Sequence, residues 1–108
     1  MPNARGFTRS VSLADTGADN WEQKPYLPLY DEARWFEDDE PLQLPENFYS
    51  SEYLVDRLIE FIGDTPGDQP FFGYLSFQAV HIPVQTPPEF TARYSDRYLD
   101  GWNVVRKT

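Results

Sequence analysis

The sequence predicts an α/β chain that is a piece of a larger sheet. Residues 50–62 have the pattern of an amphipathic helix, and a short loop leads from them into Phe71–Phe77, an apolar run typical of a buried strand. The remaining sequence offers only one weak strand and one small hairpin. Because a central strand needs a hydrogen-bonded neighbour on each edge, most of the predicted sheet lies outside these 108 residues.

Composition narrows the classes of partner. Eighteen acidic residues against nine basic ones give a net charge of −9, which repels phosphate backbones and anionic lipid and argues against nucleic-acid or membrane partners. No signal peptide is visible and no apolar run approaches the ~18 residues of a membrane span, so we expect a cytoplasmic chain by default. Zero cysteines exclude disulfides and cysteine nucleophiles.

The first half of the chain is mostly loop. Residues 6–13 alternate between apolar and polar side chains, which predicts a short strand. Residues 14–49 have no regular period and are interpreted as a loop with a small hairpin. The predicted hairpin arms are residues 34–36 and 42–44, which flank a polar turn.

Residues 50–62 form the clearest predicted element. Leu54, Leu58 and Ile62 recur at intervals of four and give the helix one apolar face. Ser50 or Ser51 is the predicted N-terminal cap. The glycine at position 63 predicts a left-handed C-terminal stop.

Residues 71–77 are the predicted central strand, because both of its faces carry large apolar groups, as in parallel strands covered by helices. Residues 78–108 are interpreted as a site loop and a helical tail. Ligands gather beyond the C-terminal ends of such strands, and this loop holds the single histidine, His81, between a strand and two stiffening prolines, Pro83 and Pro87. The position suits a donor to an anion or a general acid or base, whereas the alternative is a structural histidine that bridges two backbone groups.

Other candidate sites are weaker. The acidic stretch Glu37–Glu40 lacks the alternating spacing of a calcium loop and is interpreted as a solvated turn. Asp15 and Asp19 form an equally weak metal pair. No serine lies in a nucleophile elbow, and no glycine-rich phosphate loop is present.

Several blocks resemble the arylsulfatases of the alkaline-phosphatase-like superfamily. Residues 70–87 read P-F-F-G-Y-L-S-F-Q-A-V-H-I-P-V-Q-T-P, similar to the family's P-F-F-x-Y-L-x-F-x-A-P-H-x-P-x-Q-x-P. Residues 5–13 are similar to R-G-F-D-R-S-F-S-L, and residues 44–62 to L-P-x-x-F-Y-S-S-D-x-x-T-D-K-L-I-E-F-I. Residues 93–102 resemble K-Y-x-G-R-Y-D-x-G-W. The likeness covers nearly the whole chain, and it implies that residues 1–108 are a single partial sulfatase domain.

The resemblance implies a doubly wound α/β sulfuric ester hydrolase. Such enzymes use a formylglycine nucleophile, made from the first residue of C/S-x-P-x-R, and a calcium ion held by Asp and Asn side chains. His81 would then be the catalytic and substrate-binding residue that contacts the sulfate. The C/S-x-P-x-R motif and the family's metal-binding Asp and Asn pairs have no counterpart here, and Val80 replaces the usual proline before the histidine.

We therefore expect an arylsulfatase segment that is inactive alone, holds neither calcium nor formylglycine, and meets a sulfate ester only within a complete enzyme. The alternative is a non-catalytic module derived from a sulfatase that completes its sheet by self-association as a homo-oligomer. A third reading is an anion-binding domain that uses His81 with Arg93 or Arg97.

Overall fold

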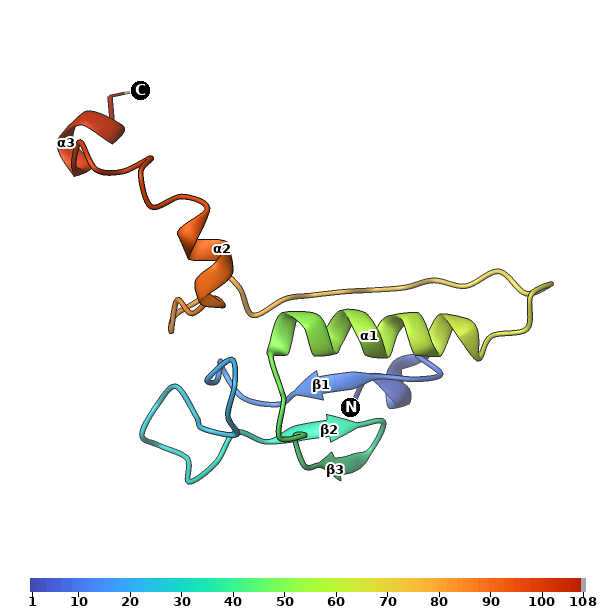
Figure 1. Cartoon of the computed structure of the whole chain (residues 1–108). Coiled ribbons are helices and arrows are strands. Elements are labelled where there is room, and N and C mark those ends of the chain that lie inside the picture. The colour runs from blue at the N-terminus through green and yellow to red at the C-terminus, as the bar shows by residue number, and fades with distance from the viewer. Residues whose placement is uncertain (108) are drawn as a thin grey trace.

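Residues 11–42 contain a three-stranded antiparallel sheet in a computed structural model that describes residues 1–107 (Figure 1). The strands are β1 (Val11–Leu13), β2 (Trp35–Glu37) and β3 (Glu40–Leu42), in the spatial order β1-β2-β3. The predicted hairpin is β2–β3, although its turn is tighter than predicted and consists of residues 38 and 39. Pro41 is tolerated in β3 because this strand lies at the edge of the sheet.

The strand predicted over residues 6–13 is limited to β1, because the preceding residues wrap around the hairpin turn. A 3₁₀ turn spans Pro2–Arg5. The Asp38 carboxylate accepts hydrogen bonds from the Ser10 backbone N–H at 2.8 Å, from Arg9 Nε at 3.0 Å and from Asn3 Nδ2 at 3.1 Å. Asp38 also has a positive φ of 53°, which Asp adopts more readily than most residues. One carboxylate thus fastens the N-terminal segment to the sheet.

Acidification is expected to weaken this fastening. Burial acts to raise the pKa of the Asp38 carboxyl, but hydrogen bonds from Asn3 and the Ser10 backbone, with the Arg9 charge, hold the pKa below its ordinary value of 3.8. A depressed folded-state pKa contributes stability above about pH 3.8, and this stability is lost as the pH falls from there through the folded-state value.

Asp38→Asn is expected to lower the unfolding free energy by about 1 kcal/mol at pH 6 and to flatten its dependence on pH below 4. Urea unfolding, followed by tryptophan fluorescence between pH 3 and pH 6, measures both effects. Asp39→Asn is the matched control, because Asp39 is exposed in the same turn. Equal pH profiles for the two variants would contradict the role of Asp38.

The predicted helix is present as α1 (Ser50–Gly63). Its predicted caps are wrong. Tyr49 is the N-cap and no side chain caps the first turn, because the Ser50 hydroxyl donates instead to Asn20 Oδ1, in the loop of residues 17–26. Gly63 does not take the left-handed conformation. Asp64 is the C-cap with φ −78°, and the Asp64 N–H still donates to the Glu60 carbonyl.

A small core joins the sheet to the start of α1. Trp35 and Phe48 are each only 2% exposed, and their rings meet edge to face with centroids 5.4 Å apart. Tyr53 of α1 packs on Phe48, with a centroid distance of 5.2 Å. The other buried apolar residues are Ala18 and Ala33, which leaves few large side chains in the core of the described residues.

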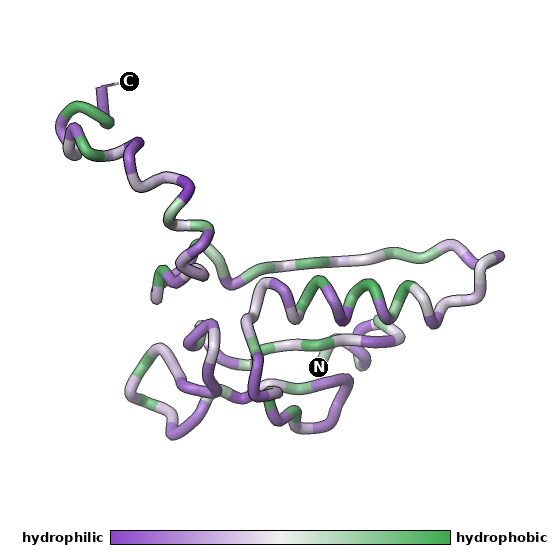
Figure 2. Tube along the Cα trace, in the orientation of Figure 1, coloured by the Kyte–Doolittle hydropathy of each residue, from purple (hydrophilic) through white to green (hydrophobic). Residues whose placement is uncertain are grey.

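Residues 71–77 are extended, but they are neither paired nor buried, so the prediction of a buried strand is wrong for this chain by itself. The segment runs along α1 (Figure 1), and a Cβ on Gly73 would lie 3.5 Å from Leu58 Cδ1. No backbone hydrogen bond joins it to another segment within residues 1–107. Phe72 is 78% exposed and Tyr74 is 70% exposed, although the stretch is largely apolar (Figure 2). The described residues supply no neighbouring strand, so its backbone groups have no hydrogen-bond partner among them.

Residues 88–107 extend away from the sheet and α1 (Figure 1). They contain two short helices, α2 (Pro88–Ala92) and α3 (Trp102–Val105), in agreement with the predicted helical tail. The radius of gyration is 17.4 Å, whereas a compact domain of this length has a value of about 13 Å. None of the helices in residues 1–107 is long and apolar enough to cross a bilayer.

Candidate functional site

His81 lies in an exposed loop directly after the extended segment, as the sequence predicts. Its Nδ1 is 2.6 Å from the Ile82 carbonyl oxygen. The ring stands edge-on to Tyr26, with centroids 5.8 Å apart and an interplanar angle of 87°. It also lies close to Gly17, where a Cβ would be 3.5 Å from Nδ1. Residues 17–26 are therefore the surface against which the histidine rests.

These contacts define what the imidazole can do. A carbonyl oxygen only accepts, so Nδ1 carries the proton that it donates to Ile82. The Nε2 atom then remains for another group. A protonated ring can donate from Nε2 to an anion, and a neutral ring can accept a proton there. Both uses that the sequence predicts for His81 are open to the exposed ring, and the bond to Ile82 fixes which nitrogen serves them.

Residues 17–26, here called the facing loop, have their own local order. Ala18 and Pro25 form an isolated antiparallel bridge, and the Asp19 N–H donates to the Lys24 carbonyl at 2.9 Å. The Asp19 Oδ1 atom accepts from the backbone N–H groups of Trp21 and Glu22 at 2.8 and 2.9 Å, an Asx-type turn. The loop is thus held by hydrogen bonds rather than by regular secondary structure.

Two glutamines tie residues 78–87, here called the histidine loop, to the facing loop. Gln78 Oε1 accepts from the Ala18 N–H at 2.9 Å. Gln85 Oε1 accepts from the Asn20 N–H at 2.9 Å, and Gln85 Nε2 donates to Asp19 Oδ2 at 2.6 Å. The sequence analysis assigned no role to Gln78, Gln85 or Asn20. The signal was present, because two amide side chains flank the histidine in an otherwise apolar, proline-rich stretch.

The two aspartates that form a weak metal pair in the sequence are occupied by protein donors. Asp15 Oδ2 accepts from the Arg34 N–H at 2.8 Å and Oδ1 from Arg34 Nη2 at 2.6 Å, and these bonds lower the pKa of its carboxyl. Burial acts to raise the pKa of Asp19, but hydrogen bonds from Gln85 and the backbone N–H groups of Trp21 and Glu22 hold it below the ordinary value. Both carboxylates thus have protein donors as their partners in this structure.

The described residues do not fit the calcium ion or the formylglycine that the resemblance implies. Within residues 1–107, no three His, Cys, Asp or Glu side chains gather as a metal site would require. The acidic turn has Asp38 engaged with its three donors. The chain has no cysteine, and no serine has proline two residues later and arginine four residues later.

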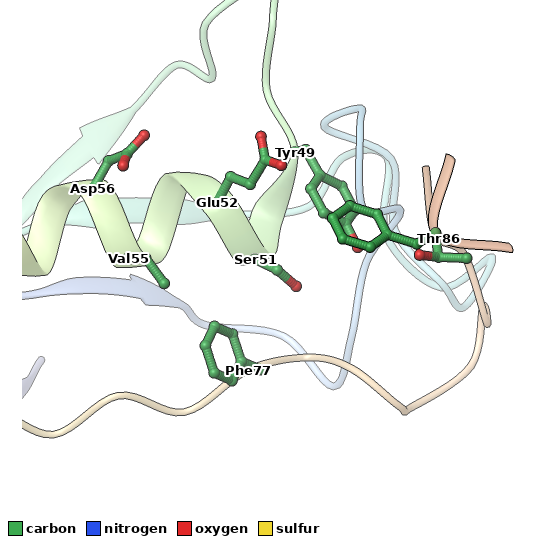
Figure 3. Close-up of a pocket in the computed structure, with 8 residues that line it drawn as sticks. Tyr49, Ser51, Glu52, Val55, Asp56, Phe77 and Thr86 are labelled. Atoms are coloured by element: carbon green, nitrogen blue, oxygen red, sulfur yellow. The ribbon is translucent and has the colours of Figure 1, made fainter. Parts of the chain in front are cut away.

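A separate cleft of about 490 Å³ lies between the first turns of α1, the end of the extended segment and α2 (Figure 3). Val55 and Phe77 point toward each other across it. Glu52 and Asp56 also line it, and their negative charges disfavour an anion. His81 does not line this cleft, so the cleft is not the predicted anion site.

The arginines proposed to assist the histidine lie elsewhere. Arg93 sits over the Phe90 ring, with its guanidinium carbon 4.8 Å from the ring centroid. Within the described part of the chain, neither Arg93 nor Arg97 has a hydrogen bond or ring contact with His81. The contacts therefore lend no support to a free-standing anion site built from these three residues.

Comparison with known proteins gives a consistent result. Residues 1–106 match the sequence model of the family described as Sulfatase. The chain is 35% identical over 116 residues to an uncharacterized sulfatase of Schizosaccharomyces pombe, covering 98% of this chain and 20% of that protein. It is 31% identical over 106 residues to the arylsulfatase of Klebsiella aerogenes, covering 96% and 23%. It is 30% identical over 116 residues to arylsulfatase J of Mus musculus, covering 99% and 18%. The chain thus spans about a fifth of the length of these curated relatives.

Proposed function

Because the chain belongs to the sulfatase family, we propose that it is the segment of an arylsulfatase that presents the sulfate-contacting histidine, and that it is inactive toward sulfate esters when alone. The observation that carries the proposal is the position of His81. It is exposed at the exit of the apolar extended segment, inside a match that spans residues 1–106. In the proposal, Nε2 is the atom that contacts a sulfate oxygen, because Nδ1 is engaged by the Ile82 carbonyl oxygen.

The exposed segment 71–77 supports the view that the rest of a sulfatase surrounds this chain. Its unpaired backbone and apolar side chains are costly to leave in water. In the proposal, strands from the other four-fifths of the protein pair with both edges, and the whole forms a doubly wound α/β fold. His81 then lies beyond the C-terminal end of an inner strand, where such folds bind ligands.

A second copy of the chain is the alternative source of the missing strands. The same free edges on residues 71–77 favour it, since exposed strand edges pair with other chains. The resulting protein is a self-associating module with no catalytic role. Light scattering coupled to size-exclusion chromatography separates the two proposals, because a discrete, cooperatively unfolding dimer of the 108-residue chain supports the module.

The purified chain is expected to hydrolyse an aryl sulfate no faster than buffer. Ester hydrolysis needs a positioned nucleophile together with charge stabilisation, and one histidine alone does not supply both. The measurement is release of the phenol from an aryl sulfate by the purified chain, with His81→Ala as the comparison. Hydrolysis that disappears in His81→Ala would overturn the proposed inactivity, whereas identical background rates support it.

A further inference from the structure

Gln85 is the central contact between the histidine loop and the facing loop. Its Oε1 accepts from the Asn20 N–H at 2.9 Å and from Asn20 Nδ2 at 3.2 Å, and its Nε2 donates to Asp19 Oδ2 at 2.6 Å. The orientation of the amide is fixed, because a backbone N–H can only donate and an ionised carboxylate can only accept. Three hydrogen bonds therefore converge on one side chain four residues after the histidine.

The partner residues connect this contact to the most regular element of the chain. The Ser50 hydroxyl and N–H, at the start of α1, donate to the side-chain and backbone oxygens of Asn20. Asn20 is 3% exposed and Ser50 is fully buried. Asn20 Nδ2 also lies 3.4 Å from the Pro83 carbonyl. The histidine loop is thus attached, through Asn20, to the N-terminus of a helix rather than to another loop alone.

His81 lies between two such attachments. Gln78, three residues before it, accepts from the Ala18 N–H, and Gln85 follows it. The ring itself is exposed and meets the facing loop only edge-on at Tyr26 and beside Gly17. The bond from Nδ1 to the Ile82 carbonyl orients the ring relative to its own loop. The weak ring contacts do not fix that loop against residues 17–26, so the placement of the ring there depends on the two glutamine attachments.

We propose that Gln85 is a positioning residue for His81, which locks the histidine loop onto Asp19 and Asn20 so that the ring is held against Tyr26 with Nδ1 on the Ile82 carbonyl. The contact between the ring and a sulfate oxygen rests on the proposed function. The effect of Gln85 on the position of the ring is independent of it. Gln85 touches neither substrate nor reacting atoms. It acts on the histidine through the backbone of residues 82–84.

Exchange of the carboxylate and the amide between positions 19 and 85 tests this role, because the double variant has the same net charge as the unsubstituted chain. Gln85→Glu places a second carboxylate against Asp19 and removes the donor, so the two loops repel each other. Asp19→Asn combined with Gln85→Glu restores a donor–acceptor pair with its polarity reversed. The asparagine can still accept from Trp21 and Glu22 through Oδ1, and the glutamate can still accept from Asn20. Gln43→Glu, the same change at an exposed glutamine, is the matched control.

The readouts come from NMR of the 108-residue chain. The unsubstituted chain should show a nuclear Overhauser effect between the Tyr26 and His81 rings. Gln85→Glu should abolish it and speed amide exchange at Asn20 roughly tenfold or more. The double variant should restore the ring contact and bring the exchange back to within about threefold. Exchange at the Ala14 N–H, which bonds to Arg34 in the sheet region, should stay unchanged throughout.

Three results would overturn the inference: no ring contact in the unsubstituted chain, a ring contact that survives Gln85→Glu, or a folded double variant that fails to recover it. Inorganic sulfate, titrated into the unsubstituted chain, separates this inference from the proposed function. His81 signals that do not respond to sulfate, together with a successful exchange of the two side chains, support the positioning role and count against the anion role.

Discussion

Phe48→Ala is expected to cost about 3–5 kcal/mol of unfolding free energy and to leave the chain without fixed tertiary packing. Phe48 is 2% exposed and lies between Trp35 of the sheet and Tyr53 of α1. Within residues 1–107, the other buried apolar residues are Trp35 and two alanines. A small domain has an unfolding free energy of only a few kcal/mol, so the loss of one of the two large buried rings among the described residues is expected to exceed it.

The measurement is near-ultraviolet circular dichroism at 25 °C together with the urea unfolding midpoint. Phe72→Ala is the matched control, since it makes the same change at a ring that is 78% exposed. That variant should stay within about 0.5 kcal/mol of the unsubstituted chain. If both variants unfolded at the same urea concentration as the unsubstituted chain, the core would not be where the structure places it.

The elements that depend on neighbouring residues in the sequence could be predicted from the sequence. The apolar spacing of Leu54, Leu58 and Ile62 predicted α1, and the polar turn predicted the β2–β3 hairpin. The caps were wrong because they depend on distant partners. Ser50 bonds to Asn20, thirty residues earlier in the chain, instead of capping its own helix. No local pattern indicates such a partner.

The error at residues 71–77 has a different origin. Apolar side chains on both faces of residues 71–77 indicate a strand that other elements cover on both sides. This chain spans about a fifth of the length of its curated relatives, and its described residues do not supply those covering elements. The segment is therefore extended but not covered by other elements, and Phe72 and Tyr74 are exposed to solvent. The sequence of this segment therefore fits surroundings that the described residues do not supply.

The site was predicted only in part for a similar reason. The position of His81 followed from its place after an apolar run, which is a local relation. The attachments that hold its loop join residues 60 and 65 positions apart, at Gln78 with Ala18 and Gln85 with Asn20. A single sequence gives no indication of which loops meet at such separations.

The second large effect concerns the histidine in a complete enzyme. A chimera in which this chain replaces the matching 106 residues of the Klebsiella aerogenes arylsulfatase has the rest of that enzyme around it. His81→Ala in this chimera is expected to reduce kcat/KM for an aryl sulfate by about 10²- to 10³-fold, the usual cost of losing one positioned donor or acid–base group. Val84→Ala, at a side chain that is 75% exposed in the same loop, should change it by less than about twofold.

This measurement tests the central claim, that the chain is the histidine-bearing part of an arylsulfatase. The account predicts a folded, active chimera whose activity is lost on His81→Ala and kept on Val84→Ala. A folded chimera that hydrolyses the aryl sulfate equally well with or without His81, or a folded chimera with no activity at all, would contradict it.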